Sequence, residues 1–216
     1  MKKIFILVLG LMSCSKEEYV TPILDQPVSM IVIDGNSLSI GQGSTTGGYA
    51  KLFRDSGYTV YVRGIGGQSL TQMINNCQDV DTTITKNALL IVDEITNELY
   101  FGSSPDTTFE RLKRYCQQRK QLHPSLRITI ITPTPRSNPG TPIDFETRRQ
   151  AVITKIKANK TFYNYLANAG EDSLIGYNGA QFNTQFYYDS VHHTNSGYDR
   201  RGLIIWNRSN LKKLGL

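Results

Sequence analysis

Four short segments of the chain are almost continuously apolar, and longer amphipathic segments separate them. The apolar segments cover 30–34, 59–62, 88–93 and 127–132, and they are rich in Ile, Val and Leu. A strand with apolar residues at consecutive positions buries both of its faces, which is typical of a parallel sheet covered by helices on each side. We therefore predict that these segments form a mainly parallel central sheet.

Helical patterns occupy the intervals between these strands and the end of the chain. We predict helices at 48–54, 70–79, 107–122, 144–169 and 196–214. Ser104, Pro105 and Asp106 precede the third of them, as expected for a helix start. The longest carries one apolar stripe, made of Phe145, Val152, Ile156, Tyr163 and Ala167. The alternation of strands and helices predicts an α/β fold, a three-layer α/β/α sandwich in which function resides at the carboxyl ends of the strands.

The first residues have the pattern of an export signal. Lys2 and Lys3 precede an apolar run at 4–12, and the run ends just before Cys14. As a helix this run would be about 14 Å long, against roughly 30 Å for the hydrocarbon core of a bilayer, so a transmembrane helix is not expected. A charged start, a short apolar run and a small residue before the cleavage point predict a signal peptide at 1–13.

The residues around this cleavage point indicate a lipid anchor. The sequence Leu11-Met12-Ser13-Cys14 resembles a bacterial lipoprotein box, which implies lipidation of the Cys14 thiol. The alternative is a plain secretory signal with an incidental cysteine. Residues 14–27 are polar and contain two prolines, so we expect a tether there and the folded domain at 28–216. The expected location is the bacterial cell envelope at the outer membrane, facing the periplasm or the surface, with the lipid anchor as the only membrane contact.

The net charge bears on whether nucleic acid is a binding partner. The 216 residues include 24 Lys and Arg against 18 Asp and Glu, a net charge of +6. There is no long basic run or basic helix face, so nucleic acid is not an expected partner.

Cys77 and Cys116 fall in segments predicted to be helical, and we expect two free, half-buried thiols although the envelope permits disulfides.

Polar or glycine-rich turns follow three of the strands, and a fourth polar cluster precedes the last helix. The turns cover 34–39, 63–69 and 94–98, and the fourth cluster covers 189–193. Together they supply a hydroxyl, an imidazole, a carboxylate and several N–H donors. Acyl transfer needs this set: a nucleophile, a base, a group that orients the base, and donors for an oxyanion.

Each member of this set also has a plain structural interpretation when it is taken singly. Ser37 suits a helix N-cap, and Gly67 or Asn97 suits a tight turn. His192 lies three residues after Asp189, which could fix its tautomer, whereas the adjacent His193 lacks that spacing. We therefore expect His192 to be the base and replacement of His193 to be mild. The combination of residues carries the prediction.

Nucleotide and metal sites fit the sequence less well. The glycine-rich segment 41–48 is not followed by the Lys-Ser or Lys-Thr of a phosphate-binding loop, and 64–67 lacks the spacing of a dinucleotide-binding motif. His192 and His193 are adjacent and project differently, and no further His or Cys cluster accompanies them. We expect no cofactor and no catalytic metal.

These clusters, in this order, resemble the SGNH or GDSL hydrolase family over 30–214. Gly35-Asn36-Ser37-Leu38 matches the family's Gly-Asp-Ser-Leu block. The resemblance implies a flavodoxin-like fold, Ser37 as the nucleophile, and an oxyanion hole made by the N–H groups of Ser37 and Gly67 and the amide of Asn97. It also implies that Asp189 and His192, in the family's Asp-x-x-His block, complete a catalytic triad.

The chain departs from the family pattern at four positions outside the implied triad. Asn36 stands where the family usually has Asp, and Val62 stands where Asn is frequent. Ile95 replaces a usual Gly, and Glu98 a usual Asp. Because Asn36 and Ile95 are next to residues of the implied site, they bear on its geometry and rate.

The expected function is that of a serine esterase acting on small acyl esters. Acetyl groups on carbohydrate are the preferred substrate, because an envelope lipoprotein encounters acetylated polysaccharides. The substrate is thus a small-molecule or oligosaccharide ester. Two alternatives stay open at this point: a non-catalytic glycan-binding lipoprotein on the same scaffold, and an O-acyltransferase.

Overall fold

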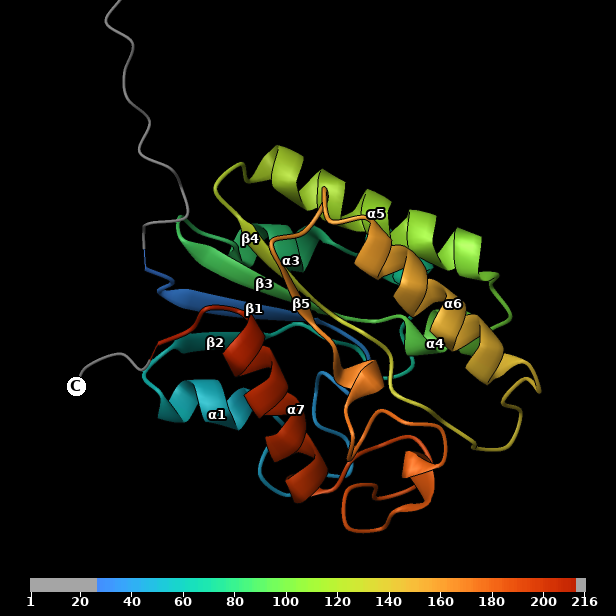
Figure 1. The fold of residues 1–216 in the computed structure, drawn as a ribbon. Coiled ribbons are helices and arrows are strands. Elements are labelled where there is room, and N and C mark those ends of the chain that lie inside the picture. Colours follow the sequence, from blue (N-terminus) through green and yellow to red (C-terminus); the bar gives the residue numbers. More distant parts are fainter. Residues whose placement is uncertain (1–26, 213–216) are drawn as a thin grey trace, which may run out of the picture.

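The computed structural model describes residues 27–212, and a five-stranded sheet lies at their centre (Figure 1). The strands are β1 (Met30–Gly35), β2 (Thr59–Val62), β3 (Ala88–Asp93), β4 (Arg127–Ile131) and β5 (Tyr165–Ala167). Their spatial order is β2-β1-β3-β4-β5, and every neighbouring pair is parallel. This is the strand order of flavodoxin-like doubly wound sheets.

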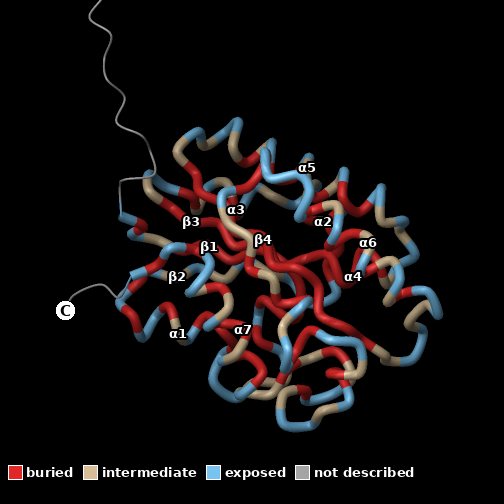
Figure 2. Tube along the Cα trace, viewed as in Figure 1, coloured by how far each residue is buried: buried red, intermediate tan, exposed pale blue. Residues whose placement is uncertain are grey.

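Strands β1, β3 and β4 are buried on both faces, as their apolar sequences predict. The prediction is wrong for β2, an edge strand in which Thr59 and Tyr61 are exposed and Val60 and Val62 half-buried. In β1, Ile31 and Ile33 pack into one hydrophobic core while Val32, between them, packs into the other. Figure 2 shows the same arrangement, with the central strands buried inside and exposed residues on the outer faces of the helices. The sheet therefore separates two cores, one on each side.

Helices cover both faces of the sheet and complete the three-layer sandwich. Residues of α2 (Leu70–Asn75), α3 (Gln78–Thr83), α4 (Thr96–Tyr100), α5 (Pro105–Leu122) and α6 (Phe145–Ala158) pack into one core. Residues of α1 (Ala50–Asp55) and α7 (Asn195–Arg208) pack into the other. Two 3₁₀ turns, Ala169–Glu171 and Ala180–Phe182, lie between β5 and α7.

Three of the predicted helices are wrong in extent. The segment 70–79 forms two helices, because the chain leaves the helical conformation at Asn76 before α3 begins. The segment 144–169 contains α6 only as far as Ala158, and it continues as a turn and the edge strand β5. Tyr163 and Ala167 are buried from that turn and strand, so they continue the apolar pattern of the helix without belonging to it.

The last predicted helix is also shorter than 196–214. Helix α7 ends at Arg208, and Ser209 is its C-cap. The two remaining cysteines are both free, as expected. Cys77 is half-buried between α2 and α3, whereas Cys116 is completely buried in α5, so the expectation of partial burial is wrong for Cys116.

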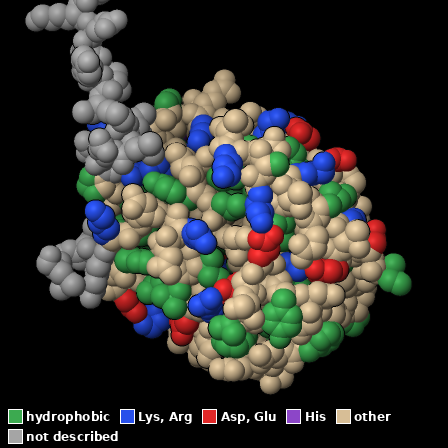
Figure 3. Space-filling model, in the orientation of Figure 1, with side chains coloured by type: hydrophobic (Ala, Val, Ile, Leu, Met, Phe, Trp, Pro, Cys, Tyr) green, Lys and Arg blue, Asp and Glu red, His purple; other side chains and the backbone are tan. Residues whose placement is uncertain are grey.

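The predicted signal peptide at 1–13, Cys14 and nearly all of the tether lie outside the described residues. Within 27–212, no helix is both long and apolar enough to cross a membrane. On the face shown in Figure 3, Lys and Arg side chains are scattered among uncharged ones and do not gather into a patch.

Candidate active site

Ser37 lies in a tight turn directly after β1. The turn is held by Asn36, whose carbonyl oxygen accepts the N–H and hydroxyl of Ser39 and whose side-chain oxygen accepts the N–H of Leu38 at 2.8 Å. At the end of the strand, a Cβ on Gly35 would collide with the carbonyl of Asp93 in β3. The sequence Gly35-Asn36-Ser37 therefore brings the hydroxyl to the carboxyl edge of the sheet through a close strand approach.

His192 joins Ser37 to Asp189 by hydrogen bonds. Its Nε2 lies 2.9 Å from Ser37 Oγ, and its Nδ1 lies 2.8 Å from Asp189 Oδ2. The other Asp189 oxygen accepts the N–H groups of Val191 at 2.7 Å and His192 at 2.6 Å. Burial raises the pKa of Asp189, but these hydrogen bonds outweigh it and hold the pKa below its ordinary value. A carboxylate that stays ionised orients the imidazole toward the hydroxyl.

Ser37, Gly67 and Asn97, which line one cavity, each offer an N–H donor. Within 27–212, the backbone N–H groups of Ser37 and Gly67 donate to no protein acceptor. Gly67 has φ +75°, a conformation that favours glycine, and a Cβ there would meet nothing within 4 Å. Asn97 Nδ2 donates one hydrogen to the carbonyl of Gln68 at 3.0 Å, which leaves its second hydrogen without a protein acceptor.

All five residues predicted from the sequence line one cavity of about 310 Å³. It lies at the carboxyl edge of the sheet, where the rule for parallel sheets places ligand sites. Its lining consists of Ser37, Gln42, Gly67, Asn97, Tyr100, Phe101, Arg136, Asn138, Asp189, Val191 and His192. The arrangement can deprotonate a hydroxyl and place donors around a negatively charged oxygen.

The neighbouring His193 points away from this cavity. It is completely buried, and its ring lies 4.5 Å from the ring of Tyr187 and 5.3 Å from that of Tyr198. Burial lowers the pKa of His193 well below its ordinary value, so the ring is neutral. His193 is a core residue, so we expect its replacement to lower stability, while the expectation that it affects hydrolysis only mildly stays a prediction.

Arg136 is a site residue that the sequence interpretation missed. It follows β4, and its Nη1 donates to Asn97 Oδ1 at 3.1 Å while its Nε donates to Asn138 Oδ1 at 2.8 Å. Its guanidinium lies 4.0 Å from the centre of the Tyr100 ring. Burial lowers the pKa of Arg136 to about 10, which still leaves it charged at neutral pH. The signal was its position after a buried strand, in Pro133-Thr134-Pro135-Arg136.

Neither a protein-family model nor a curated protein sequence matches the chain. Solved structures do match it. One is a member of the lipolytic protein G-D-S-L family from Veillonella parvula, with a TM-score of 0.65 and 16% identity over 82% of this chain and 96% of that one. Another is the psychrotrophic esterase EstA from Pseudoalteromonas, with a TM-score of 0.64 and 13% identity over 83% and 95%. A GDSL-like lipase from Bacteroides thetaiotaomicron has a TM-score of 0.61 and 20% identity over 84% and 89%.

The fold is that of the GDSL hydrolases. Within this GDSL fold, the departures at Ile95 and Glu98 have local explanations. Ile95 has a negative φ of −148°, outside the left-handed region that favours glycine, and its side chain is buried in the core, so glycine is not required there. The Glu98 carboxylate forms an ion pair with Arg111 and accepts the Ser103 hydroxyl at 2.6 Å. Neither departure removes Asn97 from the cavity.

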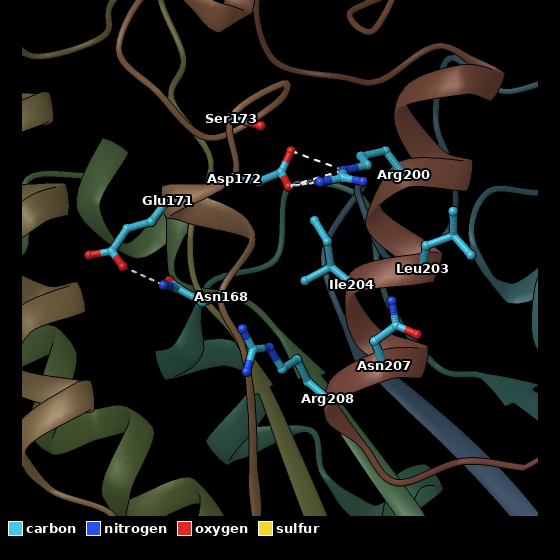
Figure 4. A pocket seen from close by; sticks show the side chains of 9 residues that line it. All are labelled: Asn168, Glu171, Asp172, Ser173, Arg200, Leu203, Ile204, Asn207 and Arg208. Carbon is cyan, nitrogen blue, oxygen red and sulfur yellow. Dashed lines mark hydrogen bonds and ion pairs between the residues drawn. The ribbon is translucent and has the colours of Figure 1, made fainter.

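A second, larger cavity of about 670 Å³ lies between α7 and the segment 168–173 (Figure 4). Four of its polar side chains pair with one another: Arg200 Nη2 lies 2.6 Å from Asp172 Oδ2, and Asn168 donates to Glu171. Ser173 supplies a hydroxyl there, but none of the nine lining residues is a histidine. Size alone therefore does not identify the reactive site.

Proposed function

We propose that the protein is a GDSL-type serine esterase that hydrolyses small acyl esters, and that acetyl esters of carbohydrate are its substrates. One observation carries the proposal. The hydrogen-bonded chain from Ser37 through His192 to Asp189 opens into the cavity that Gly67 and Asn97 also line. A base that is already in contact with the hydroxyl is the requirement for an activated serine.

In the first half of the reaction, Ser37 Oγ attacks the ester carbonyl and its proton passes to His192 Nε2. Negative charge then develops on the carbonyl oxygen, and the N–H groups of Ser37 and Gly67 and the free hydrogen of Asn97 Nδ2 stabilise it. The tetrahedral intermediate collapses, the C–O bond to the alcohol breaks, and His192 returns the proton to the departing alcohol. The acyl group is now bound to Ser37.

The second half repeats these steps with water as the nucleophile. His192 takes a proton from the water as it attacks the acyl carbon, and the proton goes to Ser37 Oγ when the acyl group leaves as a carboxylic acid. Asp189 stays ionised throughout and stabilises the imidazolium that forms twice in the cycle. No step requires a cofactor.

The size and walls of the cavity support a short acyl group. A volume of about 310 Å³ is at the lower end of the range for small-molecule sites. Phe101 and Tyr188 are more than half exposed, and Phe101 lines the cavity while Tyr188 adjoins Asp189, so aromatic faces are available to a sugar ring. The choice of carbohydrate rests on the proposed envelope location, which depends on Cys14, outside the described residues.

A serine-directed fluorophosphonate tests the reaction class. We expect it to label the wild-type protein and Ser173→Ala, a matched control in the other cavity, but not Ser37→Ala. We also expect Ser37→Ala to lose hydrolysis of p-nitrophenyl acetate by several orders of magnitude while its melting temperature stays unchanged, because no core packing is lost.

The outcomes separate the alternatives. A wild-type protein that neither reacts with the probe nor cleaves any ester would favour a non-catalytic glycan-binding role. Release of free acetate from acetylated oligosaccharides supports the hydrolase, whereas acetyl transfer that appears only when a sugar acceptor is added would assign the protein to the O-acyltransferases.

A further inference from the structure

Asn36, which stands where the GDSL pattern has Asp, has a specific partner in this chain. Its side-chain nitrogen donates to Glu94 Oε2, and its side-chain oxygen accepts the N–H of Leu38 at 2.8 Å. Both Asn36 and Glu94 are 1% exposed, so water does not compete for these bonds. The two ends of the Asn36 amide thus have fixed and different roles.

The second oxygen of Glu94 reaches a different part of the site. Oε1 accepts the N–H of Glu98 at 2.8 Å, in the first turn of α4. That same turn carries Asn97, the proposed side-chain donor to the oxyanion. One buried carboxylate therefore links the turn that holds the nucleophile with the helix that holds the donor, although Asn36 and Glu94 are 58 residues apart in the sequence.

The hydrogen bonds balance only if one partner is an amide and the other a carboxylate. Glu94 accepts the Asn36 amide at one oxygen and the N–H of Glu98 at the other, so both of its oxygens must be acceptors. Asn36 must offer one donor to Glu94 and one acceptor to Leu38. An aspartate at this position, as in the family pattern, would place two buried carboxylates against each other, at a large cost. With an amide at both positions, the side-chain NH₂ at position 94 would meet another donor, either the Asn36 amide nitrogen or the N–H of Glu98.

We propose that Glu94 is a positioning residue of the esterase site and that it acts through Asn36. The pair sets the nucleophile turn and α4 at the distance that lets Ser37 and Asn97 act on one carbonyl group. This inference rests on the proposed function. It explains the unusual Asn36 as the necessary complement of a buried glutamate.

Some neighbours of Glu94 favour its protonated form, and others favour its ionised form. Burial raises the pKa of Glu94 to about 8 and the nearby Glu98 carboxylate adds to this, while the N–H groups of Glu98 and Asn97 and the Asn36 amide lower it. The Arg136 guanidinium is close enough for the negative charge of Glu94 to raise its pKa, against the larger lowering by burial. Only the ionised carboxylate offers acceptors at both oxygens to these donors, so the fully positioned site contains the anion.

Exchanging the two side-chain types tests the pair. Asn36→Asp alone and Glu94→Gln alone each break the balance, and we expect kcat to fall by about 10-fold to 100-fold in each. The double variant, which combines Asn36→Asp with Glu94→Gln, restores one carboxylate and one amide. The introduced carboxylate accepts from the N–H of Leu38 and from the introduced amide, and the oxygen of that amide accepts the N–H of Glu98. We expect kcat of the double variant to recover to within a few-fold of wild type. Glu110→Gln, at an exposed position of α5, is the matched control.

A second measurement separates positioning from simple stability. We expect kcat of the wild type to rise between pH 7 and 9 as Glu94 ionises, and this rise to be absent in Glu94→Gln. If the double variant is no better than the product of its single changes, or if Glu94→Gln keeps the kcat and pH profile of the wild type, the inference is wrong. If the Asn36→Asp variant does not fold, recovery of folding and kcat in the double variant decides the question. A wild type without esterase activity or probe labelling would instead contradict the proposed function.

Discussion

At the scale of single residues, the proposed mechanism depends most on the imidazole of His192. His192→Ala removes the base and the proton donor, so we expect kcat to fall by roughly 10⁴-fold or more. The adjacent His193→Ala should act differently, because it removes a ring packed between Tyr187 and Tyr198. We expect it to lower the free energy of unfolding by about 2–4 kcal/mol and to affect kcat of the folded protein far less.

Urea denaturation and steady-state kinetics on the same preparations of both variants check this contrast. A His192→Ala variant with near-native kcat, or a His193→Ala variant that is inactive at unchanged stability, would mean that the other imidazole is the base.

The Asn97 amide is expected to contribute mainly in the transition state. Its bond to the carbonyl oxygen strengthens as negative charge develops, and Arg136, which donates to Asn97 Oδ1, holds the amide in place. Asn97→Ala should therefore reduce kcat by about 10²–10³, or roughly 2.7–4 kcal/mol, with little change in KM. Kinetics and melting temperature on one sample test this, and a stable variant with undiminished kcat would remove Asn97 from the oxyanion hole.

At the scale of elements, the start of α2 fixes the turn that contains Gly67. Ser69 and Gln72 form a capping box, in which each side chain accepts a backbone N–H of the other. Ser69→Ala should cost about 1 kcal/mol of unfolding free energy, as is usual for an N-cap, and should lower kcat only slightly because Gln68 still anchors the turn to Gly35. Urea denaturation measures the first effect, and an unchanged midpoint would show that the box contributes nothing.

Elements with a strong apolar period were predictable from the sequence. The strands β1, β3 and β4 were predictable, because a strand that buries both faces has a continuous apolar run in its sequence. The edge strand β5 has only three residues and half-buried side chains at Tyr165 and Leu166, so its pattern merged with that of the preceding helix. Helix α4 was missed because five residues cannot show a helical period.

The candidate site was predictable where a residue type carries the chemistry. Ser37, Asp189 and His192 belong to a recognisable set, and their positions after strands or before a helix suggested one edge of the sheet. Arg136 and Glu94 were not predictable, because their roles depend on contacts with residues 39 and 58 positions away. Such pairings exist only in the folded chain.

For the whole molecule, buried carboxyl groups predict a stability that falls as the pH rises. Burial raises the pKa of Glu94 from 4.5 to about 8 and that of Asp34 from 3.8 to about 6. Between the ordinary and the raised pKa, the native state holds a proton that the unfolded chain has lost. Each group therefore lowers the unfolding free energy by up to about 1.4 kcal/mol per pH unit within its window.

Urea denaturation at pH 5, 6, 7 and 8 measures this slope. The decline should be shallower in Glu94→Gln, which has no proton to lose, and equal slopes in the two proteins would contradict the raised pKa. Asp172 and Asp189 have lowered pKa values, so their contribution is lost in the opposite direction, as the pH falls through those values.

The proposed lipid anchor gives a prediction for the location of the whole protein. Cys14→Ala removes the thiol that would be lipidated, and within 27–212 no helix is long and apolar enough to cross a membrane. We expect the variant to leave the membrane fraction or to remain unprocessed, as judged by cell fractionation and by the mass of the product. A processed Cys14→Ala protein that stays with the membrane would favour another mode of attachment.

The hydrogen bond between Ser37 and His192 joins residues 155 positions apart. Contacts so distant in sequence close large loops and form slowly compared with local ones. Before the C-terminal segment that carries His192 packs against the sheet, Ser37 has the reactivity of an ordinary serine. The time at which a fluorophosphonate begins to label the protein during refolding therefore reports when that segment packs against the sheet. We expect a partly folded or truncated chain not to react with the probe.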